Sequence, residues 1–237
     1  MVSTTPIASS SDASVPIVGT VDLIIDSEPL WLFETNAYVV AAGRGGPAVV
    51  IDAPPDPVGI GDLLARHDLT PVAVLVSHGH VDHAAGIDAL VRPGVTAYLH
   101  PADVDMARHP GEQLRALMGA TVDVAGATVQ APFETLVGGT SLTLAGLTID
   151  VLHTPGHTPG HCCFHLPDHG IIFSGDQLFA GSIGRTDLPG GSYPTLMASM
   201  EREIMPLDPD TRVLPGHGPS TTLAVERRHN PFLQEFL

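Results

Sequence analysis

The sequence predicts an α/β protein: one large domain in which two β-sheets pack between outer layers of helices. Two observations lead to this fold class. Strand-like runs followed by helix-like segments occur up to about residue 109 and again from residue 141, so the chain has two similar halves. Apolar residues make up 43% of the 237 residues and charged residues only 15%, a balance typical of a protein with a well-buried core.

The first half is predicted from short apolar runs, a helical pattern and one continuous apolar stretch. Residues 71–78 are apolar almost throughout, which indicates a buried strand that ends where a polar cluster begins. Proline near the first position of two segments supports helix starts there. We expect strands over 21–26, 36–42, 48–52, 71–78 and 96–100, and helices over 57–69, 82–92 and 101–109.

The second half repeats this order after an irregular stretch over 110–139. That stretch fits a mobile flap over a site or an ordinary surface excursion, and we favour the excursion. The first sixteen residues are predicted to be a disordered leader, and residues 17–237 to form a single domain. We expect strands over 141–146, 147–153, 161–167, 170–176 and 211–215, and helices over 193–205 and 222–228.

The charge of the chain limits its partners. The formal net charge is −16, and all ten basic residues are arginines, because the sequence contains no lysine. The absence of lysine excludes a P-loop lysine and Schiff-base chemistry, and the acidic balance opposes binding to nucleic acid. We therefore expect no nucleic-acid partner. The expectation of a small-molecule substrate rests on the motifs later in the chain, and the oligomeric state stays open.

Cysteine usage and hydropathy favour the cytoplasm. The only two cysteines, Cys162 and Cys163, are neighbours that point to opposite faces of a strand, so a disulfide between them is not expected. The N-terminus lacks a basic region followed by a long apolar region, which argues against a secretory signal. No apolar run reaches the roughly 18–20 residues of a membrane span. We expect a cytoplasmic protein that does not enter a membrane.

Three histidines and an aspartate lie within six residues, directly after the predicted buried strand: His78, His80, Asp82 and His83. A strand end followed by a tight loop can aim the first two at one point, and the next turn can bring the other two to a second point nearby. Imidazole and carboxylate groups are ligands that zinc and similar cations prefer. The cluster therefore predicts a metal site.

The order His-x-His-x-Asp-His resembles the metal motif of the metallo-β-lactamase superfamily, and the resemblance extends from about residue 20 to the end of the chain. It implies the metallo-β-lactamase fold, a four-layer αββα sandwich of two mixed β-sheets flanked by helices. It also implies three later ligands: His157 in Thr-Pro-Gly-His-Thr, Asp176 in Phe-Ser-Gly-Asp-Gln and His217 in Pro-Gly-His-Gly-Pro.

The resemblance implies a binuclear site. One metal would be bound by His78, His80 and His157 and the other by Asp82, His83 and His217, with Asp176 and a hydroxide bridging the two. Two cations about 3.5–4 Å apart can deprotonate a bridging water near neutral pH and polarise a carbonyl. We expect two divalent metal ions, zinc first, with iron and manganese as alternatives that the same ligands accept.

Two further aspartates have expected roles. Asp82 would orient the hydroxide in addition to binding metal, which makes it the expected catalytic residue. Asp52, at the end of the predicted strand over 48–52, matches the family's first motif and would brace the metal loop. A strand-terminal aspartate in a turn is an equally good interpretation of Asp52.

The stretch from Phe173 to Gly191 resembles the glyoxalase II branch, particularly its short bacterial form, which hydrolyses S-acyl glutathione thioesters. Arg185 stands where that branch commonly places a basic residue for the glutathione carboxylate, and a guanidinium is suited to this role. An arginine that caps a turn is the alternative. We predict a metal-dependent thioesterase of the S-lactoylglutathione type that acts through a metal-bridging hydroxide.

Departures from full-length glyoxalase II leave the thiol carrier open. The chain ends about twenty residues after His217, without the helical C-terminal domain of that enzyme, and Thr186, Asp187 and Pro219 stand near positions where tyrosines are expected. The main alternative is a mononuclear iron persulfide dioxygenase, a relative that shares the Gly-Arg-Thr-Asp stretch. A lactonase, a β-lactamase (which usually has cysteine in place of Asp176) and a non-catalytic metal-binding module are weaker alternatives.

The segment 153–165, HTPGHTPGHCCFH, has a histidine at every fourth position. Pro155 and Pro159, each followed by glycine, exclude the helix that would align these side chains. We expect a strand end, two turns and a strand start, in which only His157 binds metal. His153 or His161 is expected near the site without contacting the metal, and the two cysteines are expected to be apolar strand residues.

Overall fold

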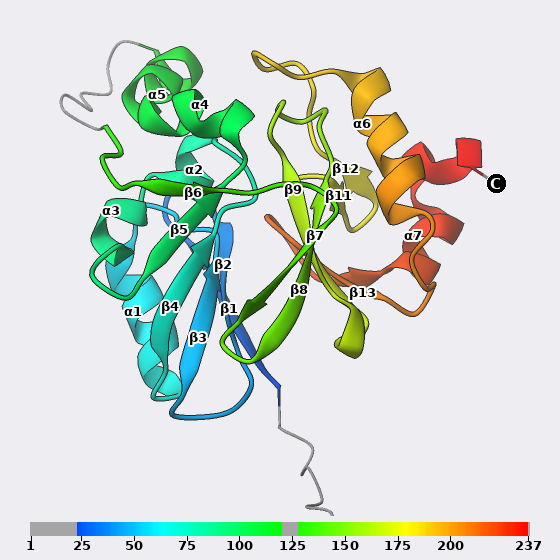
Figure 1. Ribbon diagram of the computed structural model, residues 1–237. Helices are drawn as coiled ribbons and strands as arrows, with labels where there is room; N and C mark the ends of the chain where they lie inside the picture. Colours follow the sequence, from blue (N-terminus) through cyan, green and yellow to red (C-terminus); the bar gives the residue numbers. More distant parts are fainter. Residues whose placement is uncertain (1–22, 120–127, 237) are drawn as a thin grey trace, which may run out of the picture.

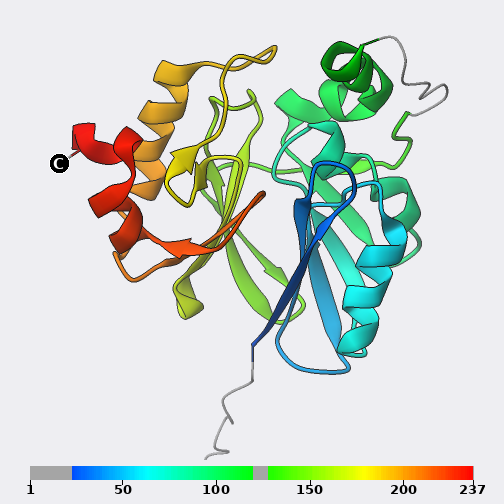
Figure 2. The same ribbon diagram turned by 180° about the vertical axis from the view of Figure 1, so that it is seen from behind.

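The computed structural model describes residues 23–119 and 128–236, and the predicted leader lies outside this range. Two six-stranded sheets pack face to face, and helices cover the outer face of each (Figure 1 and, from behind, Figure 2). The observed architecture is the predicted four-layer αββα sandwich.

The first sheet has the strand order β1-β2-β3-β4-β5-β6. Its first three strands are antiparallel, and β3 to β6 run parallel, so the sheet is mixed as predicted. The strands are β1 (Ile24–Leu30), β2 (Thr35–Ala41), β3 (Pro47–Ile51), β4 (Thr70–Leu75), β5 (Thr96–Leu99) and β6 (Phe133–Thr135). The helical elements on this side are α1 (Pro57–Arg66), α2 (Val81–Ala84), α3 (Ile87–Leu90), η1 (Pro101–Asp103), α4 (Val104–Arg108) and α5 (Pro110–Met118).

The second sheet has the order β14-β13-β10-β9-β8-β7, in which only the β10–β13 pair is parallel. Its strands are β7 (Thr140–Leu144), β8 (Leu147–His153), β9 (Cys162–Leu166), β10 (Ile171–Gly175), β13 (Arg212–Pro215) and β14 (Thr221–Thr222), and β11 (Leu178–Phe179) pairs with β12 (Ser182–Ile183) separately. The helical elements of this half are η2 (Pro167–His169), α6 (Tyr193–Ser199), the π-helical η3 (Met200–Ile204), α7 (Leu223–His229) and η4 (Pro231–Phe236).

Alternating side chains of the central strands supply separate apolar layers. In β2, Tyr38 and Val40 pack between the two sheets, whereas Val39 and Ala41 pack toward the helices of the first half. Successive strand residues point to opposite faces, so a shift of register by one residue would exchange these two sets. Full burial of a side chain such as valine contributes about 1.5–3 kcal/mol, which fixes the register.

One expected helix is not formed as a single element. The sequence predicts a helix over 82–92, but the structure has the short helices α2 and α3, with residues 85 and 86 between them. The Gly86 N–H donates to the Ala53 carbonyl across 2.8 Å, and this contact takes the amide out of the helical hydrogen-bond ladder. The expected helix over 193–205 is continuous as α6 followed by η3.

The carboxyl ends of four strands meet at one edge of the molecule. The loops that follow β4, β8, β10 and β13 carry the histidine- and aspartate-rich motifs of the sequence. Hydrogen bonds join the sheets at this edge: Asn36 Nδ2 and the Tyr38 hydroxyl both donate to the Pro215 carbonyl, across 3.0 and 2.7 Å. The fold thus places motifs from both halves in one location.

The described residues include no helix that is both long and apolar enough to cross a membrane.

Candidate metal centre

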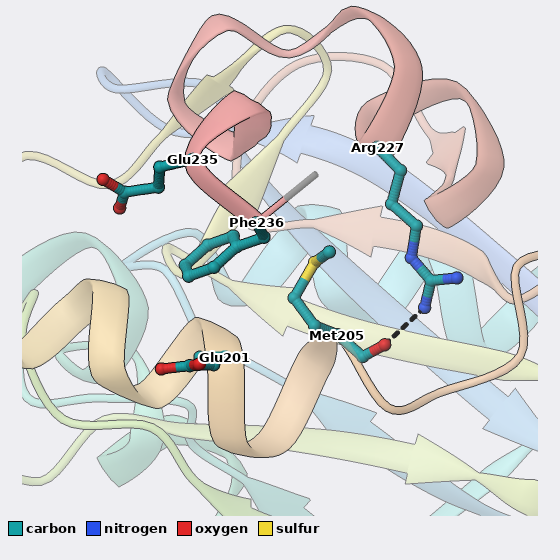
Figure 3. Close-up of a pocket in the computed structure, with 5 residues that line it drawn as sticks. All are labelled: Glu201, Met205, Arg227, Glu235 and Phe236. Atoms are coloured by element: carbon teal, nitrogen blue, oxygen red, sulfur yellow. Dashed lines mark hydrogen bonds between the residues drawn. The ribbon is translucent and has the colours of Figure 1, made fainter.

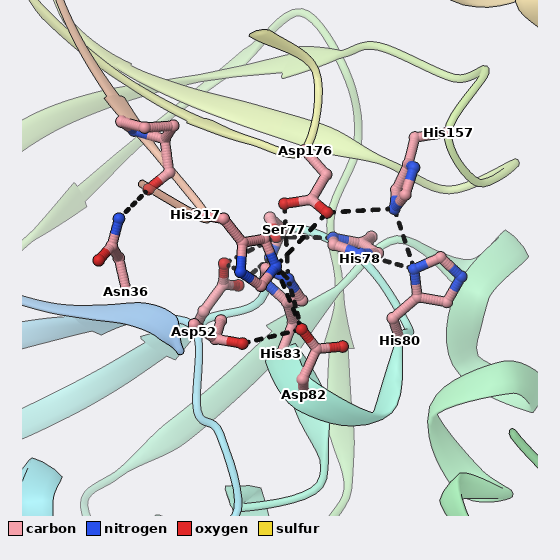
Figure 4. A network of polar contacts seen from close by, with 12 residues as sticks. Asn36, Asp52, Ser77, His78, His80, Asp82, His83, His157, Asp176 and His217 are labelled. Carbon is pink, nitrogen blue, oxygen red and sulfur yellow. Dashed lines mark hydrogen bonds and ion pairs between the residues drawn. The ribbon is translucent and has the colours of Figure 1, made fainter. Parts of the chain in front are cut away.

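The structure brings all seven predicted metal ligands to one cluster between the two sheets (Figure 4). The first sheet contributes the loop after β4 and helix α2, and the second sheet contributes three separate loops. The residues are His78, His80, Asp82, His83, His157, Asp176 and His217. Their role as metal ligands stays a prediction.

The first group of converging atoms comes from His78, His80 and His157. His80 Nδ1 lies 3.0 Å from His78 Nε2 and 2.9 Å from His157 Nε2. Ligand atoms bound at about 2.0–2.2 Å to one tetrahedral cation lie roughly 3.3–3.5 Å apart. The three nitrogens therefore need to separate by only a few tenths of an ångström to surround an ion.

The second group comes from Asp82, His83 and His217. Asp82 Oδ2 lies 3.3 Å from His83 Nε2 and 3.2 Å from His217 Nε2, and the two nitrogens are 3.3 Å apart. These distances match the spacing of ligands around one cation. The groups are those that the resemblance implies.

Asp176 lies between the two groups. Its Oδ2 is 3.4 Å from His157 Nε2 and 3.7 Å from His217 Nε2, and its Oδ1 is 3.5 Å from His83 Nε2. The buried Oδ1 has no hydrogen-bond partner among the described residues. A buried carboxylate oxygen without a partner is costly unless a cation binds it, so this position suits a bridging ligand.

Hydrogen bonds at the outer ring nitrogens orient four of the imidazoles. His83 Nδ1–H donates to Asp52 Oδ2 across 2.7 Å, His157 Nδ1–H to the Arg185 carbonyl across 2.7 Å, and His217 Nδ1–H to the Phe33 carbonyl across 3.1 Å. His78 Nδ1 faces the Ser77 hydroxyl across 2.9 Å. These contacts leave each Nε2 lone pair directed into the cluster, as a metal-binding histidine requires.

Asp52 joins two of these ligands. Its Oδ1 accepts the Ser77 N–H across 2.7 Å, and its Oδ2 accepts the Ser77 hydroxyl, across 2.8 Å, as well as the His83 ring N–H. Because the Ser77 hydroxyl donates to Asp52, it can only accept from His78, which keeps the proton on Nδ1 of that ring. Asp52 therefore has the contacts of the bracing residue that the sequence predicts. Its backbone φ of 59° is a conformation that few side chains adopt.

Burial and charge set the protonation of the cluster. Burial and the neighbouring imidazoles hold the pKa of His78 well below its usual range, and they lower the pKa of His80 to about 3. Burial opposes the charge of His83, but Asp82, Asp52 and Asp176 raise its pKa well above the usual value. Among the described residues the three buried carboxylates form ion pairs only with imidazoles and none with an arginine. This excess of negative charge fits divalent cations.

A pocket of about 330 Å³ opens onto the cluster. Part of its wall is apolar and comes from Phe33, Val81, Leu117, Met118 and Leu188. Leu117 and Met118 belong to α5, which lies in the irregular 110–139 stretch, so this helix forms a wall of the site. Residues 120–127 lie outside the described residues, and the choice between a flap and a surface excursion stays open.

Arg185 lines the same pocket, with its guanidinium held by a neighbour. Its Nε and Nη2 donate to the two carboxylate oxygens of Asp187, each across 2.7 Å. The hydrogen bonds from Arg185 lower the pKa of Asp187 to about 2, so the pair stays charged at any ordinary pH. Both side chains are more than half exposed. The substrate-binding role predicted for Arg185 stays a prediction.

Sequence reasoning missed three polar residues that contact the ligand loops. The Thr35 hydroxyl donates to Asp82 Oδ2, Asp103 accepts from two loop N–H groups, and Gln113 Nε2 donates to the Gly79 carbonyl. None of the three belongs to a metal motif, so no local signal marked them. His161 lies near the site, as expected, and accepts the Asp176 N–H at Nε2 across 3.0 Å.

The two cysteines behave as apolar residues, as predicted. Cys162 faces the space between the sheets and Cys163 the helices of the second half, and they form no disulfide. Burial raises the pKa of both thiols, that of Cys163 to about 12. Neither is a reactive thiolate.

A larger hollow of about 570 Å³ lies between η3 and the C-terminal elements (Figure 3). Glu201, Met205, Arg227, Glu235 and Phe236 line it. Arg227 Nη2 donates to the Met205 and Leu207 carbonyls across 2.6 and 2.7 Å, which attaches α7 to the end of η3. This arrangement indicates packing rather than chemistry.

Residues 30–217 match the family model of the metallo-β-lactamase superfamily, and the chain belongs to this superfamily of metallo-hydrolases. It is 38% identical over 226 residues to an uncharacterised protein of Mycobacterium tuberculosis, and the alignment covers 90% of this chain and 98% of the relative. It is 33% identical over 215 residues to the hydroxyacylglutathione hydrolase GloC of Haemophilus influenzae, and this alignment covers 88% of this chain and 97% of that enzyme.

Solved structures show the same fold. The BLEG-1 B3 metallo-β-lactamase superposes with a TM-score of 0.80 at 38% identity, covering 89% of this chain and 99% of that one. TTHA1623 in a di-iron-bound form superposes with a TM-score of 0.74 at 39% identity, covering 86% of this chain and 98% of that one. ETHE1 from Myxococcus xanthus superposes with a TM-score of 0.66 at 28% identity, covering 88% of this chain and 83% of that one. The predicted metallo-β-lactamase fold is confirmed.

Proposed function

We propose that the protein is a binuclear metal-dependent hydrolase that cleaves an S-acyl thioester of a small thiol, like glyoxalase II. The observation that carries this proposal is the position of Asp176 between two complete groups of ligand atoms that open into one pocket. Two divalent cations held there would activate water near neutral pH and polarise the substrate carbonyl. The similarity to GloC supports the thioester as substrate.

Each residue of the cluster has a distinct task in this proposal. The five histidines would hold the cations, and hydrogen bonds at the outer ring nitrogens of four of them keep those rings from turning. Asp176 would contribute its carboxylate to both groups. Asp82 lines the pocket, so it can orient the attacking water while its Oδ2 faces His83 and His217.

The leaving group decides between a thioester and an amide or lactam. A leaving nitrogen needs a proton, whereas a thiolate leaves without one. Apart from the candidate ligands, the polar residues described in the pocket wall are Gln113 and Arg185. The Gln113 amide is already bonded to the Gly79 and Met106 carbonyls, and a guanidinium does not give up its proton at neutral pH. Among the described residues the pocket wall therefore offers no spare general acid, which favours the thioester.

A mononuclear iron persulfide dioxygenase is the second candidate. It is favoured by the Gly184-Arg185-Thr186-Asp187 stretch and by the similarity to ETHE1. It needs one iron with open coordination positions, whereas this chain has ligand atoms for two cations. The native metal is part of the same question, because the ligand set accepts zinc, iron or manganese.

Metal analysis of freshly purified protein, paired with a substrate panel, tests the proposal. We expect two metal ions per chain and release of free thiol from S-lactoylglutathione or another small thioester. The panel includes a lactone, a β-lactam and, with oxygen consumption as the readout, glutathione persulfide. His157→Ala should abolish thiol release, and His229→Ala, at an exposed histidine of α7, is the matched control. One iron per chain with oxygen consumption and no thioesterase activity would overturn the proposal.

A further inference from the structure

Asp103 is a buried carboxylate that contacts two of the ligand loops without reaching a predicted metal position. It ends η1, and its side chain is fully buried. Its Oδ2 accepts the Gly79 N–H across 3.0 Å and the Thr158 hydroxyl across 2.5 Å, and its Oδ1 accepts the Gly160 N–H across 2.6 Å. Three donors to one carboxylate form charge-assisted bonds, which are stronger than ordinary hydrogen bonds.

These donors lie beside all three histidines of the first group. Gly79 separates His78 from His80, and Thr158 and Gly160 follow His157. A Cβ atom at Gly79 would lie 2.6 Å from the Asp103 carbonyl oxygen, and one at Gly160 would lie 2.7 Å from Asp103 Oδ1. Only glycine allows both loops to approach Asp103 this closely. Asp103 therefore fixes the spacing between the loops that carry the first group.

Thr35 has a similar relation to the second group. Its buried hydroxyl donates to Asp82 Oδ2 across 2.8 Å, and this oxygen is also the one that faces His83 and His217. Thr35 also forms a backbone bridge with His217. The backbone carbonyl of Phe33, two residues before Thr35, accepts the Nδ1–H of His217. The start of β2 therefore holds two of the three residues of the second group.

We propose that Asp103 and Thr35 are positioning residues, each of which sets the geometry of one metal subsite, so that the affinities of the two subsites can be changed separately. The proposal rests on the proposed binuclear centre. Among the described residues, the hydrogen bonds of the Asp103 side chain reach only loops of the first group. The Thr35 side chain reaches only the second group.

Metal titration of the full chain tests this separation without measuring activity. Metal-free protein is titrated with zinc in competition with a chromophoric chelator, and binding is followed for each of two equivalents. Thr35→Val keeps the side-chain volume and removes the hydroxyl, and Asp103→Asn keeps the shape and removes the charge. Loss of such an orienting partner weakens metal binding about 10- to 100-fold. We expect each variant to weaken one equivalent and leave the other unchanged, and Thr35→Ser to restore wild-type binding.

Ligand variants identify which subsite is affected, as in a double-mutant cycle. In a His157→Ala background, where the second group remains complete, Thr35→Val should weaken the remaining equivalent. In a His217→Ala background Thr35→Val should have no effect on metal binding. Asp103→Asn should weaken the remaining equivalent in the His217→Ala background and have no effect in the His157→Ala background. Thr211→Val is the matched control, because Thr211 is a buried threonine whose side chain forms no hydrogen bond with the described residues.

The two proposals can fail separately. If Asp103→Asn does not fold, Thr158→Val removes one of the three donors and gives a milder test of the same subsite. Equal weakening of both equivalents by each variant, or no weakening by any of them, overturns the separate positioning while the binuclear centre stands. A wild-type chain that binds no second equivalent overturns the binuclear centre and this inference together.

Discussion

His161 Nε2 accepts the backbone N–H of Asp176 across 3.0 Å, and this bond joins the residue before β9 to the loop that carries the proposed bridging carboxylate. The other ring nitrogen faces the Thr154 hydroxyl across 2.8 Å. Burial and neighbouring imidazoles hold the pKa of His161 well below its usual range, so the ring is neutral and can accept a hydrogen bond. His161, which stands in a histidine-rich motif, therefore supports the candidate ligand Asp176 by a hydrogen bond to its backbone.

Replacing His161 tests this support. His161→Leu leaves the buried Asp176 N–H without an acceptor, which costs about 1–3 kcal/mol. We expect a lower free energy of unfolding in urea and a lower kcat. His161→Gln, which can present a carbonyl oxygen, should recover part of both losses. Equal stability and activity of wild type and His161→Leu would show that the bond has no such role.

Asp187 is expected to compete with substrate for Arg185. Asp187→Asn breaks the bidentate pair and frees the guanidinium for a carboxylate on the thiol carrier. An exposed ion pair is weak, so KM for S-lactoylglutathione should fall only a few-fold.

Two comparisons control the Asp187 experiment. KM for a thioester of an uncharged thiol should not change, and Arg185→Gln should abolish the gain. Because the pKa of Asp187 is about 2, the effect should be constant between pH 5 and pH 9. A gain of the same size with the uncharged carrier would contradict competition at Arg185.

Metal removal should destabilise the protein. Without cations the cluster leaves three carboxylates, those of Asp52, Asp82 and Asp176, close together in the interior. A ligand at one hundred times its dissociation constant stabilises the folded state by about 2.7 kcal/mol. We expect a chelator to lower the melting temperature by several degrees and added zinc to restore it. An unchanged melting temperature after verified metal removal would argue against metal binding in this cluster.

The cysteines should be unreactive in the folded state. Both thiols are buried and their pKa values are raised, so a thiol reagent should modify neither Cys162 nor Cys163 in native protein at pH 8. Two thiols per chain should react after unfolding in guanidinium chloride. Loss of activity upon rapid native modification would show that a cysteine contributes to the site.

Local sequence patterns were sufficient for the layers of the fold and for the metal loop over 78–83, whereas His157, Asp176 and His217 were found through the family resemblance. The apolar run 71–78 ends at a polar motif, so the metal loop could be placed before any contact was known. The helix expected over 82–92 was wrong because the Gly86 N–H bonds to Ala53, more than thirty positions earlier. A helical pattern carries no information about such a contact.

The sequence, through motifs that resemble those of one family, determined the chemical identity of the candidate site: five imidazoles and two carboxylates. Only the tertiary structure decided what holds them. The Thr35 hydroxyl reaches Asp82 across 47 positions and Asp103 reaches Gly160 across 57. Such bonds depend on how two sheets pack, and threonine and aspartate occur in any surface loop. Their importance arises from burial, because a polar group removed from water needs a partner that only the folded chain can supply.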